Sequence, residues 1–246
     1  MQGDCLELLS LVPDKSVDMI CADLPYGTTQ CKWDTIIPLD RLWQHYERVL
    51  KDRGVIALHA QTPFDKVLGA SNLRLLKYEW IWEKTAATGH LNAKKAPMKA
   101  HENILIFYKK LPKYHPQKTT GHSPVHSYTK HTDDGDCYGA TQVGISGGGS
   151  TERYPRSVVV FSPDKQKCAL HPTQKPIGLI EYLLRTYTDE GDLVLDNCMG
   201  SGTTGVACKR LGRGFIGMEL DENYFEIAKR RIEEEQNAYR IHRSNR

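Results

Sequence analysis

Several features are missing from the 246-residue chain, and each absence excludes a class of protein. No stretch approaches the roughly 20 apolar residues that a membrane-spanning helix needs. The first residues lack the basic and then apolar pattern of a signal peptide, so we expect a cytoplasmic protein. With 33 basic and 30 acidic residues, the net charge is only +3. Overall charge therefore does not indicate nucleic-acid binding.

The cysteines lack the spacings that would mark a disulfide framework or a metal site. There are seven, an odd number, with no C-x-x-C pair and no H-x-E followed by P-C-x-x-C. These absences argue against a disulfide-stapled domain and against a zinc site, including that of nucleobase deaminases. We therefore expect no bound metal.

Apolar runs alternate with helical patterns over much of the chain. Strands are predicted near residues 17–22, 55–58, 78–82, 104–108, 193–196 and 215–218, and helices near 6–11, 39–50, 63–70, 177–187 and 222–239, with one more helix ending at 211. This alternation predicts a mostly parallel sheet with helices on both faces. Residues 84–99 are polar and basic without periodicity, and they are predicted to form a long functional loop.

The composition changes near residue 109. Residues 109–166 are rich in Lys, His, Thr, Ser, Gly and Tyr, and they contain a single apolar stretch at 157–161. We interpret 109–166 as an insertion with little core of its own, between α/β segments at 1–108 and 167–246.

A glycine-rich turn at 196–205 follows one predicted strand and opens a helix. Its sequence D-N-C-M-G-S-G-T-T-G contains G-x-G-x-x-G, which lets a ligand approach the backbone at the helix start. Glu219 ends the next strand, where an acid can accept hydrogen bonds from ribose hydroxyls. The unit predicts an adenosine-bearing cofactor, either a dinucleotide or another type.

Two observations favour S-adenosylmethionine over a dinucleotide. Only 27 of the 246 residues follow Glu219, so the second nucleotide-binding half of a dinucleotide site would have to precede the first. The Asp196 carboxylate would repel a pyrophosphate but would pair with an ammonium group. The predicted cofactor residues in this unit are Asp196, Cys198, Gly200, Ser201, Gly202, Thr203, Thr204 and Glu219.

The tetrapeptide Asp23-Leu24-Pro25-Tyr26 lies at the end of the first predicted strand. It resembles the signature of the DNA amino-methyltransferases, which is Asp, Asn or Ser followed by Pro, Pro and an aromatic residue. The resemblance implies a Rossmann-like methyltransferase fold with a seven-stranded sheet. It also implies that the Asp23 carboxylate and the Leu24 carbonyl accept the two amine hydrogens of an extruded base, on which Tyr26 stacks. Leu24 replaces the usual proline, but its carbonyl remains.

Other segments carry the same resemblance. Residues 3–9, GDCLELL, resemble the opening motif of the family, which implies that Asp4 and Cys5 face the cofactor adenine. The family has a strand before this motif, so we expect either a shortened first strand or a sequence that begins after it. Residues 171–176, HPTQKP, resemble the motif that places Thr173 or Lys175 near the methionine carboxylate. The catalytic turn precedes the cofactor turn, as in the permuted β class. The segments 82–84, 89–95 and 101–103 look like phage or prophage members.

The resemblance assigns roles to the three segments and leaves the substrate open. It implies a catalytic half at 1–108, a target-recognition insertion at 109–166 and a cofactor-binding half at 167–246. Asp23 favours adenine N6, because Ser is commoner in cytosine-N4 enzymes. No proline precedes a cysteine, so the nucleophile of cytosine-C5 methylation is missing. The alternatives are a cytosine-N4 enzyme, a catalytically impaired DNA-binding relative and a dinucleotide-dependent oxidoreductase.

The predicted partner is double-stranded DNA, and a homodimer or a cognate restriction enzyme would be compatible with the resemblance. Residues 109–176 hold ten Lys or Arg against five Asp or Glu, and such clusters neutralise phosphates. His59 and His101 are interpreted as hydrogen-bonded histidines near the core. The predicted DNA-binding residues are Trp33, Lys84, Lys94, Lys95, Lys99, Arg153 and Arg156.

Overall fold

The computed structural model describes residues 1–29, 31, 34–130, 142–163 and 174–244. They form two compact units, one of Met1–His115 with Ser157–Arg246 and one of Pro116–Arg156. No helix among the described residues is long and apolar enough to cross a membrane.

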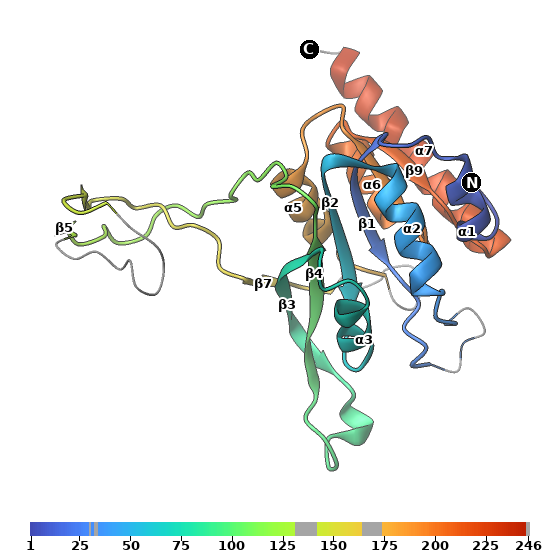
Figure 1. The fold of residues 1–246 in the computed structure, drawn as a ribbon, viewed down its shortest axis with the longest axis horizontal. Coiled ribbons are helices and arrows are strands. Elements are labelled where there is room, and N and C mark those ends of the chain that lie inside the picture. Colours follow the sequence, from blue (N-terminus) through green and yellow to red (C-terminus); the bar gives the residue numbers. More distant parts are fainter. Residues whose placement is uncertain (30, 32–33, 131–141, 164–173, 245–246) are drawn as a thin grey trace. The chain divides into compact units, whose positions relative to one another are not determined.

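The larger unit is built on a seven-stranded sheet with the order β7-β3-β4-β2-β1-β8-β9 (Figure 1). The strands are β1 Val17–Asp23, β2 Leu50–Ala60, β3 Leu76–Thr88, β4 Lys99–Phe107, β7 Val158–Phe161, β8 Leu193–Asp196 and β9 Gly214–Gly217. Neighbours pair in parallel except at β2–β4 and β4–β3. The predicted mostly parallel α/β sheet is confirmed.

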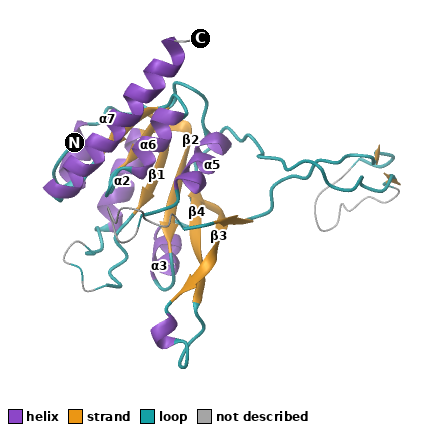
Figure 2. Ribbon diagram, turned by 180° about the vertical axis from the view of Figure 1, so that it is seen from behind, coloured by secondary structure: helices purple, strands orange, loops and turns teal. Residues whose placement is uncertain are grey.

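Helices cover both faces of this sheet (Figure 2). One face carries α1 Cys5–Leu8, the 3-10 turn Leu9–Leu11, α2 Leu39–Val49 and α3 Phe64–Ser71, and the other carries α5 Ile177–Tyr187 and α6 Thr203–Arg210. α7 Glu222–Ser244 packs against α6.

Alternation along β1 divides the hydrophobic core in two. Ile20 and Ala22 pack in the cluster that contains α2 and α3, whereas Met19 and Cys21 pack in the cluster that contains α5. Successive side chains of a strand point to opposite faces, so the next residue after Cys21 on the α5 face is Asp23. Each fully buried large apolar side chain contributes about 1.5–3 kcal/mol, which holds the ends of these strands firmly in place.

The segment predicted as a long loop at 84–99 is mostly a β-hairpin, so that prediction is wrong for its ends. β3 continues to Thr88 and β4 begins at Lys99, with Glu83 opposite His101 and Thr88 opposite Lys99. Only the tip, with the 3-10 turn His90–Asn92, lies outside the strands. Residues 88–101 are all exposed, so their sequence shows no alternation of apolar and polar residues. Backbone pairing nevertheless extends the two strands into this region.

The smaller unit has little regular structure, with the two short strands β5 Tyr128–Thr129 and β6 Ser146–Gly147. A bridge between Thr119 and Arg153 closes its base. The apolar stretch 157–161, which the sequence placed inside the insertion, forms β7 at the edge of the main sheet. The target-recognition role of 109–166 stays a prediction.

Before the opening motif, an isolated parallel bridge joins Gln2 to Glu219. The Gly3 amide donates to the Glu219 carbonyl at 2.9 Å. This contact brings the opening motif beside the end of β9, next to the glycine-rich turn.

Replacing Gly202 by alanine is expected to destabilise the fold more than replacing Gly89. Both have positive φ, +82° and +90°, but a Cβ on Gly202 would lie 2.8 Å from the Ala228 Cβ, whereas nothing lies within 4 Å at Gly89. We expect a loss of about 1 kcal/mol in the free energy of unfolding for G89A and about 2–4 kcal/mol for G202A. Urea unfolding of both variants measures the difference. Equal losses would mean that the packing of α6 on α7 is not tight.

Candidate active site

The catalytic-type turn begins where β1 ends. Asp23 is the last residue of β1, and the Leu24 side chain is buried in the core beside α2. The Tyr26 ring stacks on Phe64 of α3, with 5.3 Å between ring centroids and 24° between planes. The residues before and after Pro25 are therefore both held by packing.

Asp34 fixes the loop that follows the turn. Its carboxylate accepts the backbone amides of Gly27 at 2.8 Å, Thr28 at 2.9 Å and Thr29 at 2.7 Å. Burial alone would raise the pKa of Asp34, but these hydrogen bonds outweigh it and the pKa is lowered. Asp34 is thus ionised, and its hydrogen bonds fix the backbone of the loop.

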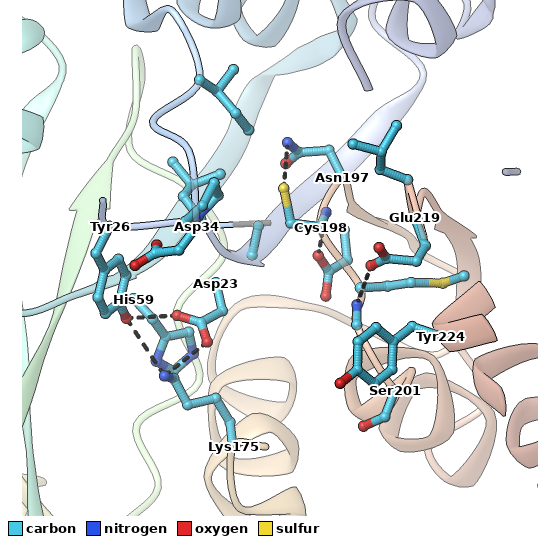
Figure 3. Close-up of a pocket in the computed structure, with 18 of the residues that line it drawn as sticks. Asp23, Tyr26, Asp34, His59, Lys175, Asn197, Cys198, Ser201, Glu219 and Tyr224 are labelled. Carbon is cyan, nitrogen blue, oxygen red and sulfur yellow. Dashed lines mark hydrogen bonds and ion pairs between the residues drawn. The ribbon is translucent and has the colours of Figure 1, made fainter. Parts of the chain in front are cut away.

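Both oxygens of Asp23 have partners (Figure 3). The Tyr26 hydroxyl donates to Oδ1 at 2.6 Å, and Lys175 Nζ lies 2.8 Å from Oδ2. Burial and the nearby Asp23 charge raise the pKa of Tyr26 well above its usual value, so the hydroxyl stays a donor. Each carboxylate oxygen has two lone pairs, so Asp23 keeps accepting capacity toward the pocket.

Lys175 is also paired with a second acid. Its Nζ lies 2.9 Å from Glu102 Oε2, and Lys84 Nζ lies 2.7 Å from Glu102 Oε1. Burial alone would lower the pKa of Lys175, but Asp23 and Glu102 outweigh it and raise the pKa. Burial alone would likewise raise the pKa of Glu102, but the two lysines lower it to about 2.

His59, on β2 in register with Asp23, differs from the histidine that the sequence led us to expect. It is buried, but neither ring nitrogen has a hydrogen-bond partner among the described residues. Burial, followed by the Lys175 charge, lowers the pKa of His59 to about 4, so the ring is neutral at pH 7. His101 is exposed on the hairpin, so its expected place near the core is wrong.

The glycine-rich turn lies at the end of β8, next to β1 in the sheet. Asp196 ends β8. Its Oδ1 accepts the Cys198 amide at 3.1 Å, and its carboxylate also accepts a hydrogen bond from the Thr204 side chain. Burial is the main cause that raises the pKa of Asp196 to about 7. A buried carboxylate with so high a pKa is well suited to a cationic ligand.

Glu219 ties the two sides of the turn together. Its carboxylate accepts the Gly200 amide on Oε2 and the Asp221 amide on Oε1, both at 2.9 Å. Burial raises the pKa of Glu219 despite these bonds. The carboxylate keeps lone pairs that can accept hydroxyl groups.

The remaining predicted cofactor residues surround this turn. Asp4 caps α1 by accepting the Leu6 amide at 2.8 Å, and the thiols of Cys5 and Cys198 share a hydrogen bond. Ser201 and Thr203 are buried at the start of α6, and Gly202 is the N-cap of α6. Lys175 lies against Asp23 and lines the cavity, and its place near the methionine carboxylate stays a prediction. Thr173 lies outside the described residues.

One cavity of about 1080 Å³ connects the two turns. Its lining includes the residues 22–26 at the end of β1, the residues 196–201 of the glycine-rich turn, and Asp4, Cys5 and Glu219. Ligand pockets commonly measure about 300–1,000 Å³, so this one has room for a cofactor and a second group beside it. No cluster of three metal-ligating side chains occurs in the described part of the chain.

The predicted DNA-binding residues are dispersed. Lys94 and Lys95 are exposed near the tip of the hairpin, and Lys99 is exposed at the start of β4. Lys84 is only 9 % exposed and faces Glu102, and this buried ion pair does not match the phosphate contact predicted for it. Arg156 is exposed, and Trp33 lies outside the described residues.

Arg153 belongs to the smaller unit and holds its backbone together. Its guanidinium donates to the carbonyls of Ser150 at 3.0 Å and Glu152 at 2.9 Å. The contact to DNA predicted for Arg153 stays a prediction.

The structure adds Asp34, His59 and Glu102 to the site residues that the sequence predicted. Each lines the cavity. A sequence signal existed for His59 and Glu102, because both continue the buried alternation of a strand with a polar side chain in an apolar position. Asp34 had no comparable signal.

Comparison with known proteins decides the family. The profile of the N6_N4_Mtase family, described as DNA methylase, matches residues 17–230. The chain belongs to this family of DNA methylases. It is therefore an S-adenosylmethionine-dependent DNA methyltransferase.

Relatives and solved structures agree with this family. Type II methyltransferase M1.MboII of Moraxella bovis is 30% identical over 253 residues, covering 92% of this chain and 93% of that protein. M2.DpnII of Streptococcus pneumoniae is 28% identical over 261 residues, covering 96% and 89%. The M1.HpyAVI complex with S-adenosylmethionine has a TM-score of 0.64 at 25% identity, covering 94% of this chain and 98% of that one. The cytosine-N4-specific PvuII methyltransferase shares the fold, with a TM-score of 0.69 at 17% identity over 97% and 90%.

The residues of this methyltransferase fit S-adenosylmethionine. Asp196 is a buried carboxylate with a raised pKa, suited to the ammonium group, and Glu219 is a half-buried acceptor suited to ribose hydroxyls. Gly200 and Gly202 have positive φ values of 50° and 82°, and Gly200 lines the cavity, where a ligand can approach its backbone. Asp196 and Glu219 are thus two carboxylates that this cofactor can use.

Proposed function

We propose that the methyltransferase transfers a methyl group to the exocyclic N6 amine of an adenine extruded from double-stranded DNA. The observation that carries this proposal is the cavity that joins the Asp23 turn to the Asp196 turn. The two turns end neighbouring parallel strands, β1 and β8. Ligands of open α/β sheets bind at this edge.

The amine of adenine is a poor nucleophile because its lone pair is delocalised into the ring. In the proposed complex the Asp23 carboxylate and the Leu24 carbonyl accept its two hydrogens, which favours the lone pair on nitrogen. The Tyr26 ring stacks on the base and stabilises the positive charge that develops during transfer. Pro25 restrains the turn.

S-adenosylmethionine supplies the methyl group from its sulfonium. Asp196 would hold its ammonium, Glu219 its ribose hydroxyls, and Asp4 with Cys5 would lie at its adenine. Ser201, Thr203 and Thr204 would form the wall beside the methionine part. Proton loss from the methylated amine goes to Asp23 or to water.

DNA contacts are assigned to basic groups outside the cavity. Lys94 and Lys95 are exposed at the hairpin tip, where they can reach phosphates, and Arg156 offers another exposed cation. Phosphate contacts of this kind make affinity fall steeply with salt. The chain order, with the catalytic turn first, supports the permuted β class.

Cytosine N4 is the second candidate, because the family covers methylation of both amines. Both bases present an exocyclic amine beside a ring nitrogen acceptor, and the Asp23 turn suits either. Asp23 favours adenine, as argued above from its signature.

Nucleoside analysis separates the two candidates. DNA incubated with the protein and S-adenosylmethionine is digested to nucleosides and examined by mass spectrometry. We expect N6-methyladenine and no N4-methylcytosine. Only N4-methylcytosine would support the second candidate, and cofactor binding without methylation of either base would refute both.

A further inference from the structure

Four buried charged side chains alternate in sign across one face of the sheet. They are Lys84 on β3, Glu102 on β4, Lys175 just before α5 and Asp23 at the end of β1. Successive contacts measure 2.7, 2.9 and 2.8 Å. The side chains of Lys84, Glu102 and Lys175 are each 9 % exposed, and Asp23 at the cavity end is 26 % exposed.

Register explains why these residues meet. Trp82 pairs with Glu102 across β3–β4, and Asp23 pairs with His59 across β1–β2. The apolar residues two positions away, such as Trp82, Ile104 and Cys21, all lie in the core cluster that faces α5. The charged side chains therefore lie on the same face of the sheet as this core cluster, at the edge where ligands bind.

The charges of this row balance at neutral pH. Lys84 and Lys175 are cations, Glu102 and Asp23 are anions, and the neutral ring of His59 adds no further charge. Removing one member leaves an uncompensated buried charge, which is costly. In this row Lys175 lies between the two acids.

Lys175 has an anchor that does not depend on Asp23. Glu102 holds its ammonium from the strand side, and Lys84 in turn holds Glu102. Lys175 then fixes Oδ2 of Asp23, while the bond from Tyr26 reaches Oδ1. The lone pair that meets a substrate amine thus has a direction set by Lys175 and, behind it, by Glu102 and Lys84, which line the same cavity.

We propose that Glu102, supported by Lys84, is a positioning residue that acts through Lys175 to orient the Asp23 carboxylate toward the target amine. This inference rests on the proposed role of Asp23 as acceptor of that amine. A displacement of about 1 Å in a reacting geometry can cost about 10²-fold in rate. Glu102 thus affects methyl transfer through Asp23, although its side chain also lines the cavity.

The test uses the double variant K84M/E102Q of the full chain. It removes one positive and one negative charge, so the buried row stays neutral while Lys175 loses its anchor. We expect the single-turnover rate of methyl transfer to fall about 10–100-fold. The dissociation constants for S-adenosylmethionine and for substrate DNA should each stay within about twofold.

A matched control removes a different ion pair. Lys51 and Asp18 pair at 2.8 Å near the opposite end of β1, so K51M/D18N makes the same change of charge away from the cavity. We expect its single-turnover rate to stay within about twofold of wild type. E102D keeps the charge of Glu102 and should recover part of the rate lost by K84M/E102Q.

Each outcome decides the proposal. A single-turnover rate within twofold of wild type in a folded K84M/E102Q protein that binds cofactor would overturn it. Weakened cofactor binding with an unchanged rate at saturation would also overturn it, in favour of a structural role. Weakened DNA binding with a normal rate would instead assign Lys84 to the phosphates. Absence of methylation by wild type on any DNA would contradict the proposed function itself.

Discussion

Replacement of Asp23 by alanine is expected to lower the rate of methyl transfer by at least about 10²–10³-fold, the usual cost of removing a group that stabilises developing charge. Alanine removes the carboxylate that accepts the target amine and that holds the Tyr26 hydroxyl. The Asp196 turn belongs to other strands of the sheet, so the cofactor should bind with a dissociation constant within a few-fold of wild type. Radiolabelled methyl incorporation and isothermal titration calorimetry measure the two quantities.

Tyr26→Phe provides the matched comparison for Asp23→Ala. Phenylalanine keeps the ring that stacks on Phe64 but cannot donate to Asp23. We expect a rate loss of about tenfold, because one hydrogen bond to an ionised acid is worth roughly 1.5 kcal/mol. Near-normal turnover by the D23A variant would remove Asp23 from the mechanism.

Local motifs could be predicted from the sequence because their residues are contiguous. The turn at Asp23 and the turn at Asp196 each follow a buried strand, and each carries its chemistry within about ten residues. Parallel strands expose their carboxyl ends at one edge, so even the meeting of the two turns followed from strand type. The structure places both turns on a single cavity.

The charge row was not predicted because it depends on strand register. Lys84 and Glu102 lie 18 positions apart and meet only because β3 and β4 are antiparallel. The sequence segment around them reads as a polar loop, which favoured solvent exposure and a phosphate contact for Lys84. The charge row would have been predicted from a strand pattern in which the buried face changes from apolar to charged residues.

The same reasoning explains the different outcomes for two histidines. His59 follows Val55 and Ala57 on the buried face of β2, whereas His101 lies one residue away from the face that holds Glu102 and Ile104. A shift of one residue along a strand reverses the face. Composition alone cannot distinguish the two positions.

Replacement of Asp196 by asparagine is expected to stabilise the free protein and to weaken cofactor binding strongly. In the folded protein the pKa of Asp196 is raised from 3.8 to about 7, chiefly by burial. A group with a raised pKa in the folded state binds its proton more tightly there, so its contribution to stability is complete below pH 4 and is lost as the pH rises toward 7. Above pH 7 the ionised, buried carboxylate costs up to about 4 kcal/mol.

The stability effect of D196N should therefore depend on pH. At pH 8 we expect its free energy of unfolding to exceed that of wild type by about 2–4 kcal/mol, and at pH 4 the two should be nearly equal. Asp189→Asn is the control, because Asp189 is exposed and its pKa is lowered by Lys113; that variant should gain nothing at pH 8. Urea titrations at the two pH values give the comparison.

Cofactor binding should show the opposite preference, because the ligand ammonium needs the ionised form of Asp196. Below pH 7 the affinity of wild type for S-adenosylmethionine is expected to fall about tenfold per pH unit. Above about pH 8 it should fall again, because an α-amino group loses its proton there. D196N should bind weakly at every pH and lose the acid limb. If the loss of affinity at acid pH persists in D196N, another group is responsible for it. If D196N no longer shows that loss and is also more stable at pH 8, the site keeps a destabilising buried carboxylate in order to bind its ligand.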